Sequence, residues 1–460
     1  MSHIRRYALR ALAGALLTLC TVASASAQHW SGDARRIGMG GVGTSENIAS
    51  KMAEEERGYR TIVIPLGLFQ VLEDIDIFNP DSDKFDLVRS VEYAASPLHY
   101  TFDRDGTGTG ALFVNAIRNG ELDLDLNTYK GFIPVTQPVV YGLGNPNWGG
   151  TIPVFRSGRT RQGIYIGGGP YLGFRGAFTI DDELTRLLGS TADVYIANAH
   201  FPVTSDLRAD LALAITGGYR GIFALETGGD RDGVYVGVNY HYLRGFLFED
   251  ADIGVRLDTD GAGLLTVDPT LPAPIALSRI SSSDGRGFAI DAGVATVLHE
   301  WEFGFGVNGI ANEIKWTDVE STTYTLSDIF TGGDFVESIT VPVGDLTSKQ
   351  PVEYTGDVAY RANHWTAVAQ ASKRVTDDPA DEGRFDGLTY RAGFEYRVLL
   401  LEPRVGTYYT RERWHPVAGI GVNFGVIGLD TAVFWGDANV QREKHPSFAV
   451  SLRIGRRNGR

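Results

Sequence analysis

The sequence has almost no cysteine, and its one cysteine, Cys20, lies in a segment that we expect to be removed. Residues 1–27 have the features of a secretory signal peptide: arginines precede an apolar stretch, and Ala25-Ser26-Ala27 provides the small residues of a cleavage site. The mature chain would then contain no thiol. This excludes disulfide bonds and cysteine-ligated metal sites from the exported protein.

Positive charge is also scarce. The chain has 42 lysines and arginines against 56 acidic residues, which gives a formal net charge of -14. Loss of the signal peptide, which carries Arg5, Arg6 and Arg10, would make the mature chain more acidic still. Because proteins that bind nucleic acid usually carry a basic patch, we expect no nucleic-acid partner.

Beyond residue 27 the sequence has no apolar run of about 18 residues, which excludes a membrane-spanning helix. It also lacks any Pro/Ser-rich linker, charge block or low-complexity tract that would divide it into domains. Glycine is instead spread along the whole length. A single large architecture is therefore favoured over the two or three soluble domains that such a length would ordinarily suggest.

Apolar and polar residues alternate with a period of two along many segments, which is typical of strands with one buried face. The same alternation recurs around residues 288–298, 301–308, 388–398, 420–424, 429–435 and 448–455. In the clearest example, one face carries Val234, Val236, Val238, Tyr240 and Tyr242, and the other carries Tyr235, Gly237, Asn239 and His241. These segments predict an all-β protein.

The alternation fits either a soluble sandwich or propeller or a membrane barrel, because each buries one face of its strands. Aromatic residues lie near the ends of the apolar faces, as in the girdles of transmembrane barrels, and no blade-length repeat recurs. We therefore predict an antiparallel up-and-down transmembrane β-barrel over residues 60–455. The candidates to line its lumen are Asn239, His241, Asp291, Glu302, Asn308, Arg391, Glu395, Arg397 and Arg453.

The ends of the mature chain and the longest polar segments read differently from the strands. Residues 28–59 contain a glycine cluster followed by a polar, helix-friendly stretch, which we interpret as a small plug. Residues 456–460 form a basic tail after the last strand-like segment. The segments 258–286, 318–351 and 372–386 are expected to be external loops, since such barrels have short turns on one side and long loops on the other.

The sequence lacks the motifs of common enzymes, including the Gly-x-Ser-x-Gly elbow, His-Glu-x-x-His and a phosphate-binding loop. We therefore predict that the protein is not an enzyme and has no cofactor. His241 and Asp291 could join a serine in a membrane-embedded hydrolase. The favoured interpretation is a histidine and a carboxylate that face the lumen.

Three Asp-x-Asp-Gly stretches are weak candidates for calcium sites, because clustered carboxylates suit a hard cation. None of them completes an EF-hand loop, and Asp-Gly is also a favoured pair at hairpin turns. Turns are the favoured interpretation, so we expect no metal site. The residues concerned are Asp103, Asp105, Asp230, Asp232, Asp258 and Asp260.

The mature N-terminus, Ala34-Arg35-Arg36-Ile37-Gly38-Met39-Gly40-Gly41-Val42-Gly43, resembles the opening of an outer-membrane β-barrel superfamily. This superfamily includes FadL-like long-chain fatty-acid transporters, TraF-like barrels and PorV-type secretion proteins. The segments 419–424, 429–434 and 445–455 are similar to its last three strands. The resemblance implies a barrel of about 14 strands with an N-terminal hatch inside it. The hatch candidates are Gly38, Met39, Gly40, Gly41 and Gly43.

From this resemblance we expect a channel or transporter for hydrophobic small molecules, embedded in the lipid of the cell outer membrane. A PorV-like secretion or assembly accessory, which would bind a secreted or periplasmic protein, is the alternative, and a membrane-embedded hydrolase is a third. A transporter should show an apolar pocket linked to the hatch. An accessory should show long ordered loops and no pocket, and a hydrolase should place a serine beside a histidine.

Overall fold

A computed structural model of the chain describes residues 33–43, 47–57, 59–66, 99–101, 124–125, 139–144, 148–181, 198–259, 261, 264–266, 275–326, 336–376, 387–410, 413–434 and 447–457. The expected signal peptide and the calcium candidates Asp103, Asp105 and Asp260 lie outside the described residues. So do residues 458–460 of the expected basic tail. Arg456 and Arg457, by contrast, belong to the last strand.

Two short helices precede the strands. Helix α2 spans Ala34–Gly38 and α3 spans Ile48–Glu56. Each begins after a residue whose side chain accepts hydrogen bonds from the first backbone amides, Asp33 for α2 and Asn47 for α3. Such caps satisfy donors that a helix start leaves without intrahelical partners.

The described strands form one antiparallel sheet. Their bounds are β1 Tyr59–Pro65, β2 His99–Thr101, β3 Leu124–Asp125, β4 Val139–Gly144, β5 Trp148–Ser157, β6 Thr160–Ile180, β7 His200–Ala224, β8 Gly233–Thr259, β9 Leu264–Thr266, β10 Ile275–Ser282, β11 Asp284–Leu298, β12 Trp301–Leu326, β13 Val336–Ser348, β14 Val352–Arg361, β15 Trp365–Val375, β16 Gly387–Tyr396, β17 Leu401–Thr410, β18 Arg413–Asn423, β19 Ile427–Phe434 and β20 Ser447–Arg457. Consecutive strands pair almost throughout, which is the connectivity of an up-and-down barrel.

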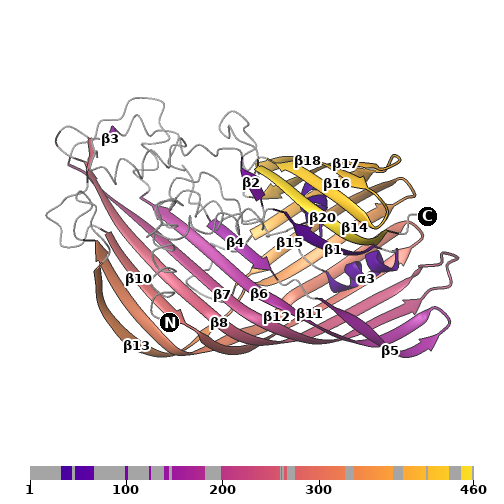
Figure 1. Cartoon of the computed structure of the whole chain (residues 1–460), viewed down its shortest axis with the longest axis horizontal. Helices are drawn as coiled ribbons and strands as arrows, with labels where there is room; N and C mark the ends of the chain where they lie inside the picture. Colours follow the sequence, from indigo (N-terminus) through magenta and orange to yellow (C-terminus); the bar gives the residue numbers. More distant parts are fainter. Residues whose placement is uncertain are drawn as a thin grey trace.

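Several of these strands continue one another end to end and share a partner. For example, β10 and β11 both pair with β8 and β12, and β13 and β14 both pair with β12. With such strands taken together, the described strands fill fourteen positions, in the order β1/β2, β20, β19, β18, β17, β16, β15, β14/β13, β12, β11/β10, β8, β7, β6 and β5/β4. The short strand β9 pairs with the end of β8 and with β3. The sheet curls into the predicted barrel (Figure 1).

The barrel has two unlike halves. Strands β6, β7, β8 and β12 are 21, 25, 27 and 26 residues long, whereas β14 to β20 have 8 to 11 residues each. Figure 1 shows the long strands sweeping across the lower part of the molecule and the short yellow and gold strands at the upper right. We call these the long-strand half and the short-strand half.

The prediction of an external loop is wrong for two of the three segments. The segment 258–286 contains β9, β10 and the start of β11, and the segment 318–351 contains the end of β12 and all of β13. Their polar composition suggested loops because a strand that crosses a bilayer is apolar on its lipid face. A strand that continues into water carries polar residues on its outer face as well.

Short turns gather at one end of the barrel, which we call the short-turn end. They are residues 158–159, 225–232, 299–300, 362–364, 397–400 and 424–426. The connections at the opposite end of the described strands are longer, except that only residues 411–412 separate β17 from β18. Among the described residues, no helix is long and apolar enough to span a membrane.

Candidate functional site: the plugged barrel interior

The N-terminal residues 33–43 and 47–57, which we call the plug, pack against the inner wall. Ile37, Met39 and Gly40 belong to its first part, and a cross-strand pair of glycines, Gly393 of β16 and Gly406 of β17, lies directly beneath Met39 and Gly40. A side chain at either wall glycine would collide with the plug backbone. Gly40 has a φ of +79° and lies so near Thr407 and Ala392 that only glycine fits there.

The other hatch candidates occupy the same stretch. Gly38 packs against Gly419 and Ala432, and the backbone amide of Gly43 donates a 3.1 Å hydrogen bond to Gln370 Oε1. Gly41 donates its amide to Arg36 O at 2.8 Å, which tightens the turn after α2. The structure therefore brings these candidates together between α2 and the short-strand half.

Helix α3 packs against the long-strand half through apolar contacts. Ile48, Ala49, Met52 and Ala53 form a buried cluster with Tyr235, Ala295 and Val297 of β8 and β11. Glycines of the wall again make room, since Gly237 lies under Ile48 and the pair Gly293 and Gly306 lies under Asn47. Glycine alternates with apolar residues in these strands because the plug packs closely against their inner face.

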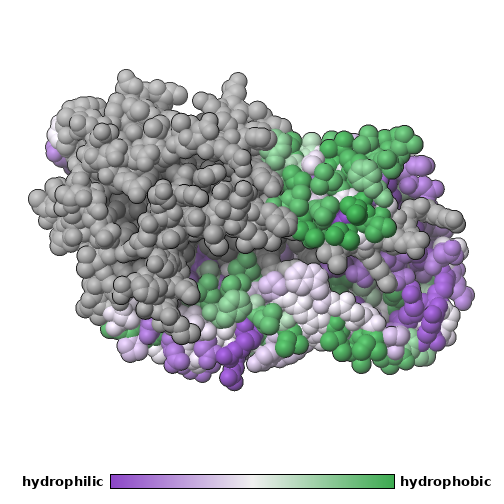
Figure 2. All heavy atoms as spheres, in the orientation of Figure 1, coloured by the Kyte–Doolittle hydropathy of each residue, from purple (hydrophilic) through white to green (hydrophobic). Residues whose placement is uncertain are grey.

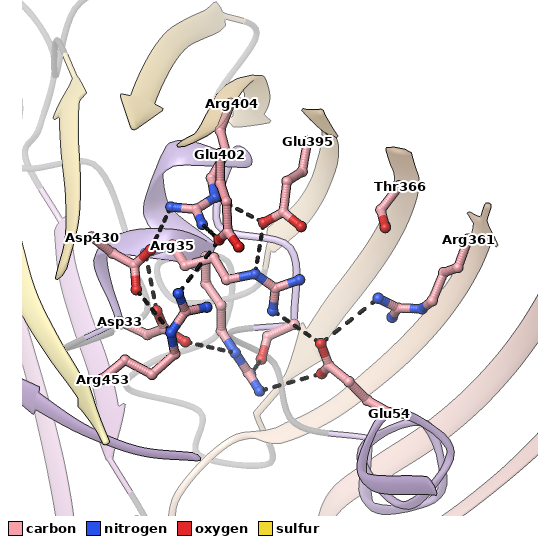
Figure 3. Close-up of polar contacts among 12 residues, drawn as sticks. Asp33, Arg35, Glu54, Arg361, Thr366, Glu395, Glu402, Arg404, Asp430 and Arg453 are labelled. Carbon is pink, nitrogen blue, oxygen red and sulfur yellow. Dashed lines mark hydrogen bonds and ion pairs between the residues drawn. The ribbon is translucent and has the colours of Figure 1, made fainter. Parts of the chain in front are cut away.

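Charged residues join the plug to the short-strand half (Figure 3). Arg35 Nε donates to Glu395 Oε2 at 2.8 Å, and Arg35 Nη1 contacts Glu54 Oε1 of α3 at 3.0 Å. Glu54 also lies 3.7 Å from Arg361 of β14, whose Nε donates to Glu302 at 3.0 Å. Arg35 therefore links α2, α3 and the wall in a single chain of charges.

Arg404 is the centre of this chain on the wall. Its fully buried guanidinium contacts Glu395 at 2.8 Å, Glu402 at 2.6 Å and Asp430 at 2.7 Å. Arg453 adds contacts to Glu402 at 3.4 Å and Asp430 at 3.6 Å. Buried pairs of this kind contribute little net stability, but loss of one partner leaves an uncompensated charge and costs about 3–5 kcal/mol.

The C-terminal end of α3 reaches both halves of the barrel. Glu54 approaches Arg361 of β14, and Glu56 forms an ion pair with Arg161 of β6. Carboxylates at a helix C-terminus are unfavourable in isolation, because that end of the helix dipole is negative. The wall arginines compensate for this, and α3 is held across the short-turn end of the lumen, where Figure 1 shows it.

A polar cavity lies between the plug and the wall of β12, β14 and β15. Its lining includes Arg36, Lys51, Glu302, Asp357 and Gln370. Asp357 accepts a 2.9 Å hydrogen bond from Ser50 Oγ, whereas Glu302 Oε1 is buried with no hydrogen-bond partner among the described residues. Charged side chains therefore share this cavity with Met39, Val42 and Val368, so it is not the wholly apolar pocket expected of a hydrophobic transporter.

The predicted pair His241 and Asp291 is in direct contact. His241 Nε2 lies 2.8 Å from Asp291 Oδ2, and His241 Nδ1 lies 2.8 Å from Thr216 Oγ1. Asp291 Oδ1 also accepts the amide of Gly309 at 2.8 Å. Thr216 and His241 are buried, with exposures of 1% and 0%. The hydroxyl beside the histidine belongs to a buried threonine instead of a serine, so this site presents no exposed nucleophile.

The remaining lumen candidates also lie on the inner face. Asn239, Glu302, Arg391, Glu395 and Arg453 are buried. Arg391 donates to Ser372 Oγ at 2.8 Å, and Arg397 donates to Glu395 Oε1 at 3.2 Å. Asn308 is half-buried and lies on the β12 segment that pairs with β14. Arg397 and Glu395 therefore contact each other, whereas Glu302 and Arg453 pair with other residues of the wall.

Asp232, a calcium candidate, organises the β7–β8 turn. Its carboxylate accepts hydrogen bonds from Thr227 Oγ1 at 2.5 Å, from the Gly229 amide at 3.1 Å and from the His299 amide at 2.7 Å. Burial opposes ionisation of Asp232, but these hydrogen bonds outweigh it and lower the pKa of the carboxyl. The described residues contain no group of three or more His, Cys, Asp or Glu side chains placed to hold a metal ion.

A second group of residues fills the lumen in the long-strand half, farther from the short-turn end than the plug. The sequence did not reveal it. Trp316 of β12 is fully buried and packs with Tyr171, Leu243 and Phe248 from β6 and β8. Its Nε1 donates to Ser348 Oγ at 2.9 Å. The ring lies over Gly245 and Gly285, where any larger residue would displace it. This apolar cluster fills the inside of the wall at that level.

Polar contacts complete this closure. Asp210 of β7 accepts hydrogen bonds from Ser348 Oγ at 2.5 Å and from Gln350 Nε2 at 2.6 Å. Ser348 and Gln350 lie at the break between β13 and β14. In the sheet, three positions (β12, β10/β11 and β8) lie between this break and β7. Direct contact between such distant strands means that the sheet folds inward there. We call the Trp316 cluster and these contacts the seal.

The outer face of the barrel carries an apolar belt. Along β12 it runs from Trp301 to Ile310, a span that fits the ~9–11 residues with which a tilted strand crosses a bilayer. Beyond it lie exposed ion pairs, Arg244 with Asp284 at 2.9 Å and Lys315 with Asp345 at 2.6 Å. Figure 2 shows hydrophobic residues gathered over the short strands at the upper right.

Aromatic rings edge this belt near the short-turn end. Tyr360 packs against Trp301 at 4.9 Å between ring centroids and against Trp365 at 4.8 Å. Trp365 lies 5.9 Å from Phe394 of the next strand. Rows of this kind mark the boundary between lipid and water in transmembrane barrels.

No protein-family model matches the chain, and no curated protein matches it significantly. Among solved structures, a mutant of the monoaromatic hydrocarbon channel TodX aligns with 64% of this chain and 83% of its own, at 13% identity and a TM-score of 0.33. The P. putida toluene transporter TodX covers 64% and 89% at 12% identity (TM-score 0.28). The β domain of the Bordetella autotransporter BrkA covers 62% and 98% at 13% identity (TM-score 0.21). Likenesses this weak add nothing to the strand pairing of the chain itself.

The strand pairing, the outward apolar belt with its aromatic edge and the polar interior define the class of protein. The chain is an antiparallel transmembrane β-barrel of the outer-membrane type, with its N-terminal residues packed inside.

Proposed function

We propose that this protein is an outer-membrane channel for hydrophobic small molecules, closed in the present state by the plug and by the seal. The observation that carries the proposal is the placement of apolar side chains inside the long-strand half. A barrel wall that only had to face water would carry polar residues there. Here Leu243, Phe248 and Trp316 line the interior above the plug.

A second apolar surface lies nearer the short-turn end, where Ile48 and Met52 of α3 meet Tyr235. Between the two apolar surfaces lies the polar band of Asn239, His241 and Asp291. A cargo that follows the long-strand half would meet an apolar surface, one polar band and a second apolar surface. The charged cavity on the opposite side of the plug lies outside this route.

The proposal is tested by mass spectrometry of small molecules that co-purify with the barrel in detergent, compared between the wild type and Trp316→Ala. We expect an apolar compound that is retained by the wild type and depleted in the variant. Trp316→Phe serves as the matched control, because it keeps most of the apolar area and removes only the hydrogen bond to Ser348. Absence of any such compound from the wild type would sink the proposal.

One observation favours a second candidate, a secretion or assembly accessory. Strands β7, β8, β10, β12 and β13 continue past the apolar belt as an ordered, charged wall, on which Arg244 pairs with Asp284 and Lys315 pairs with Asp345. Such a wall offers a surface for a protein partner. Cross-linking in intact cells tests it: a protein captured reproducibly at position 315, together with an empty wild-type barrel, favours the accessory.

A further inference from the structure

Two neighbouring turns at the short-turn end expose large apolar side chains. The β16–β17 turn contains Leu399, which is 99% exposed, and the β18–β19 turn contains Phe424 and Val426, which are 67% and 60% exposed. Val398, Leu400, Leu401 and Ile427 flank them and are exposed as well. We call these residues the apolar turn patch.

The other described turns at the same end are polar. The β7–β8 turn carries Glu226, Asp230 and Arg231, the β11–β12 turn is His299-Glu300, and the β14–β15 turn includes Asn363 and His364. All of these residues except Arg231 are exposed. The apolar character is therefore confined to the turns of β16 to β19 and is not a general property of this rim.

The patch continues the apolar belt without a polar border. On the outer face of β16, Phe394 and Tyr396 lead directly to Val398, and on β18, Ile420 leads to Phe424. The polar residues nearby point inward: Arg397 donates to Glu395 at 3.2 Å, and Asn423 contacts Glu402 at 3.3 Å. No charged side chain separates the belt from the turns.

The belt length agrees with this continuity. On β16 the apolar outer face runs from Leu388 to Val398, and on β18 it runs from Trp414 to Phe424. Each of these runs is about the ~9–11 residues needed to cross the hydrocarbon core. The turns themselves then fall at the boundary of the bilayer, where apolar and aromatic side chains are favoured over charged ones.

Because the short turns of outer-membrane barrels face the periplasm, we propose that the apolar turn patch is inserted in the lipid on the periplasmic side and anchors β16 to β19. The polar turns between β7 and β15 would remain in water, below the aromatic row of Trp301, Tyr360 and Trp365. The barrel would therefore sit deeper in the membrane along β16 to β19 than along β7 to β15. The patch would contact the lipid interface, which is continuous with the lipid around the belt.

The test uses single cysteines labelled with an environment-sensitive fluorophore, in a Cys20→Ser background reconstituted into phosphatidylethanolamine/phosphatidylglycerol vesicles. Leu399→Cys reports on the patch, Asn363→Cys on a polar turn at the same end, and Val238→Cys on the belt. We expect the emission at position 399 to be blue-shifted as at position 238, and to be quenched by lipids that carry a spin label near the headgroup. The label at position 363 should emit as in water and resist quenching.

A label at position 399 that emits as in water, like that at position 363, would overturn the proposal. So would a label that becomes shielded only when a periplasmic protein is added or when the barrel associates with a second copy. Because the substituted residue is fully exposed, Leu399→Cys should not disturb folding. Heat-modifiable gel mobility of each labelled variant verifies that the barrel is intact.

Discussion

The two halves of this barrel hold their interiors closed by different means. In the short-strand half, Arg404 and Arg453 meet Glu395, Glu402 and Asp430, and Arg35 of the plug joins this group through Glu395. In the long-strand half, the Trp316 cluster fills the lumen, and Trp316 is linked through Ser348 to Asp210. Charge thus holds the plug on one side, and apolar packing seals the other.

The difference between ion pairs and apolar packing indicates which half of the barrel could open. Buried ion pairs tolerate little movement, because separation of the partners leaves a charge without compensation. Apolar contacts can instead be replaced by those of an apolar ligand at small cost, since the hydrophobic effect is not directional. The ionic half is suited to stay fixed and the apolar half to exchange its contacts for those of a cargo.

The largest effect should follow from Arg404→Ala. It leaves Glu395, Glu402 and Asp430 buried without their common partner, which we expect to cost about 3–5 kcal/mol of unfolding free energy. Urea unfolding of the refolded barrel in detergent measures this loss. The control is Arg244→Ala, which removes an exposed pair with Asp284 and should change stability by no more than about 1 kcal/mol. Equal effects of the two substitutions would contradict the assignment of Arg404 to a buried network.

Trp316→Ala should have an effect of about 3–5 kcal/mol at most, and less if the wall collapses into the space. Its distinguishing result is local. Hydrogen exchange should increase in β8, β12 and β13 and remain unchanged in β16 to β20. Exchange that rises equally in both halves would show that the seal and the ionic network form one unit.

A smaller effect is expected for Glu56→Gln, which weakens the ion pair with Arg161 at the edge of the lumen. Because both side chains are partly exposed, the loss should be about 0.5–1 kcal/mol. Planar-bilayer recordings should show more frequent brief openings than in the wild type. Lys373→Gln on the outer face provides a charge change that should leave the openings as they are.

The smallest effect concerns the β7–β8 turn. The lowered pKa of Asp232 means that its folded pKa lies below the unfolded value, so its contribution to stability is present above about pH 4 and is lost as pH falls through the folded pKa. Asp232→Asn should remove roughly 1 kcal/mol at neutral pH and make stability less dependent on pH in the acid range. Identical acid-unfolding curves for the variant and the wild type would refute this.

The sequence predicted the wall well, because a period of two assigns every residue of a strand to one face. The apolar set Val234, Val236, Val238, Tyr240 and Tyr242 faces outward, and Asn239, His241 and Asp291 face inward as expected. Residues that contact one another locally or across adjacent strands follow from this pattern. The register of neighbouring strands then brings His241 and Asp291 within hydrogen-bond distance.

The seal could not be predicted in this way. Asp210 lies 138 and 140 residues from its partners Ser348 and Gln350, in strands that are not neighbours in the sheet. Their contact depends on an inward fold at the break between β13 and β14, and no periodicity encodes such a break. The same break lies in a polar stretch that the sequence suggested to be a loop. The Arg404 network was missed in part because Glu402 and Asp430 were not distinguished from other inward carboxylates.

The proposed route requires α3 to separate from the long-strand half, and a reversible tether tests this most directly. Gly237 of β8 lies under Ile48 of α3, and a Cβ at position 237 would lie 3.2 Å from Ile48 Cβ, so Ile48→Cys with Gly237→Cys should form a disulfide between plug and wall. Uptake of an apolar fluorescent compound into reconstituted vesicles is then measured before and after reduction. We predict that uptake is blocked in the oxidised protein and restored by reductant. Equal uptake in both states, with the disulfide verified by gel mobility, would contradict the claim.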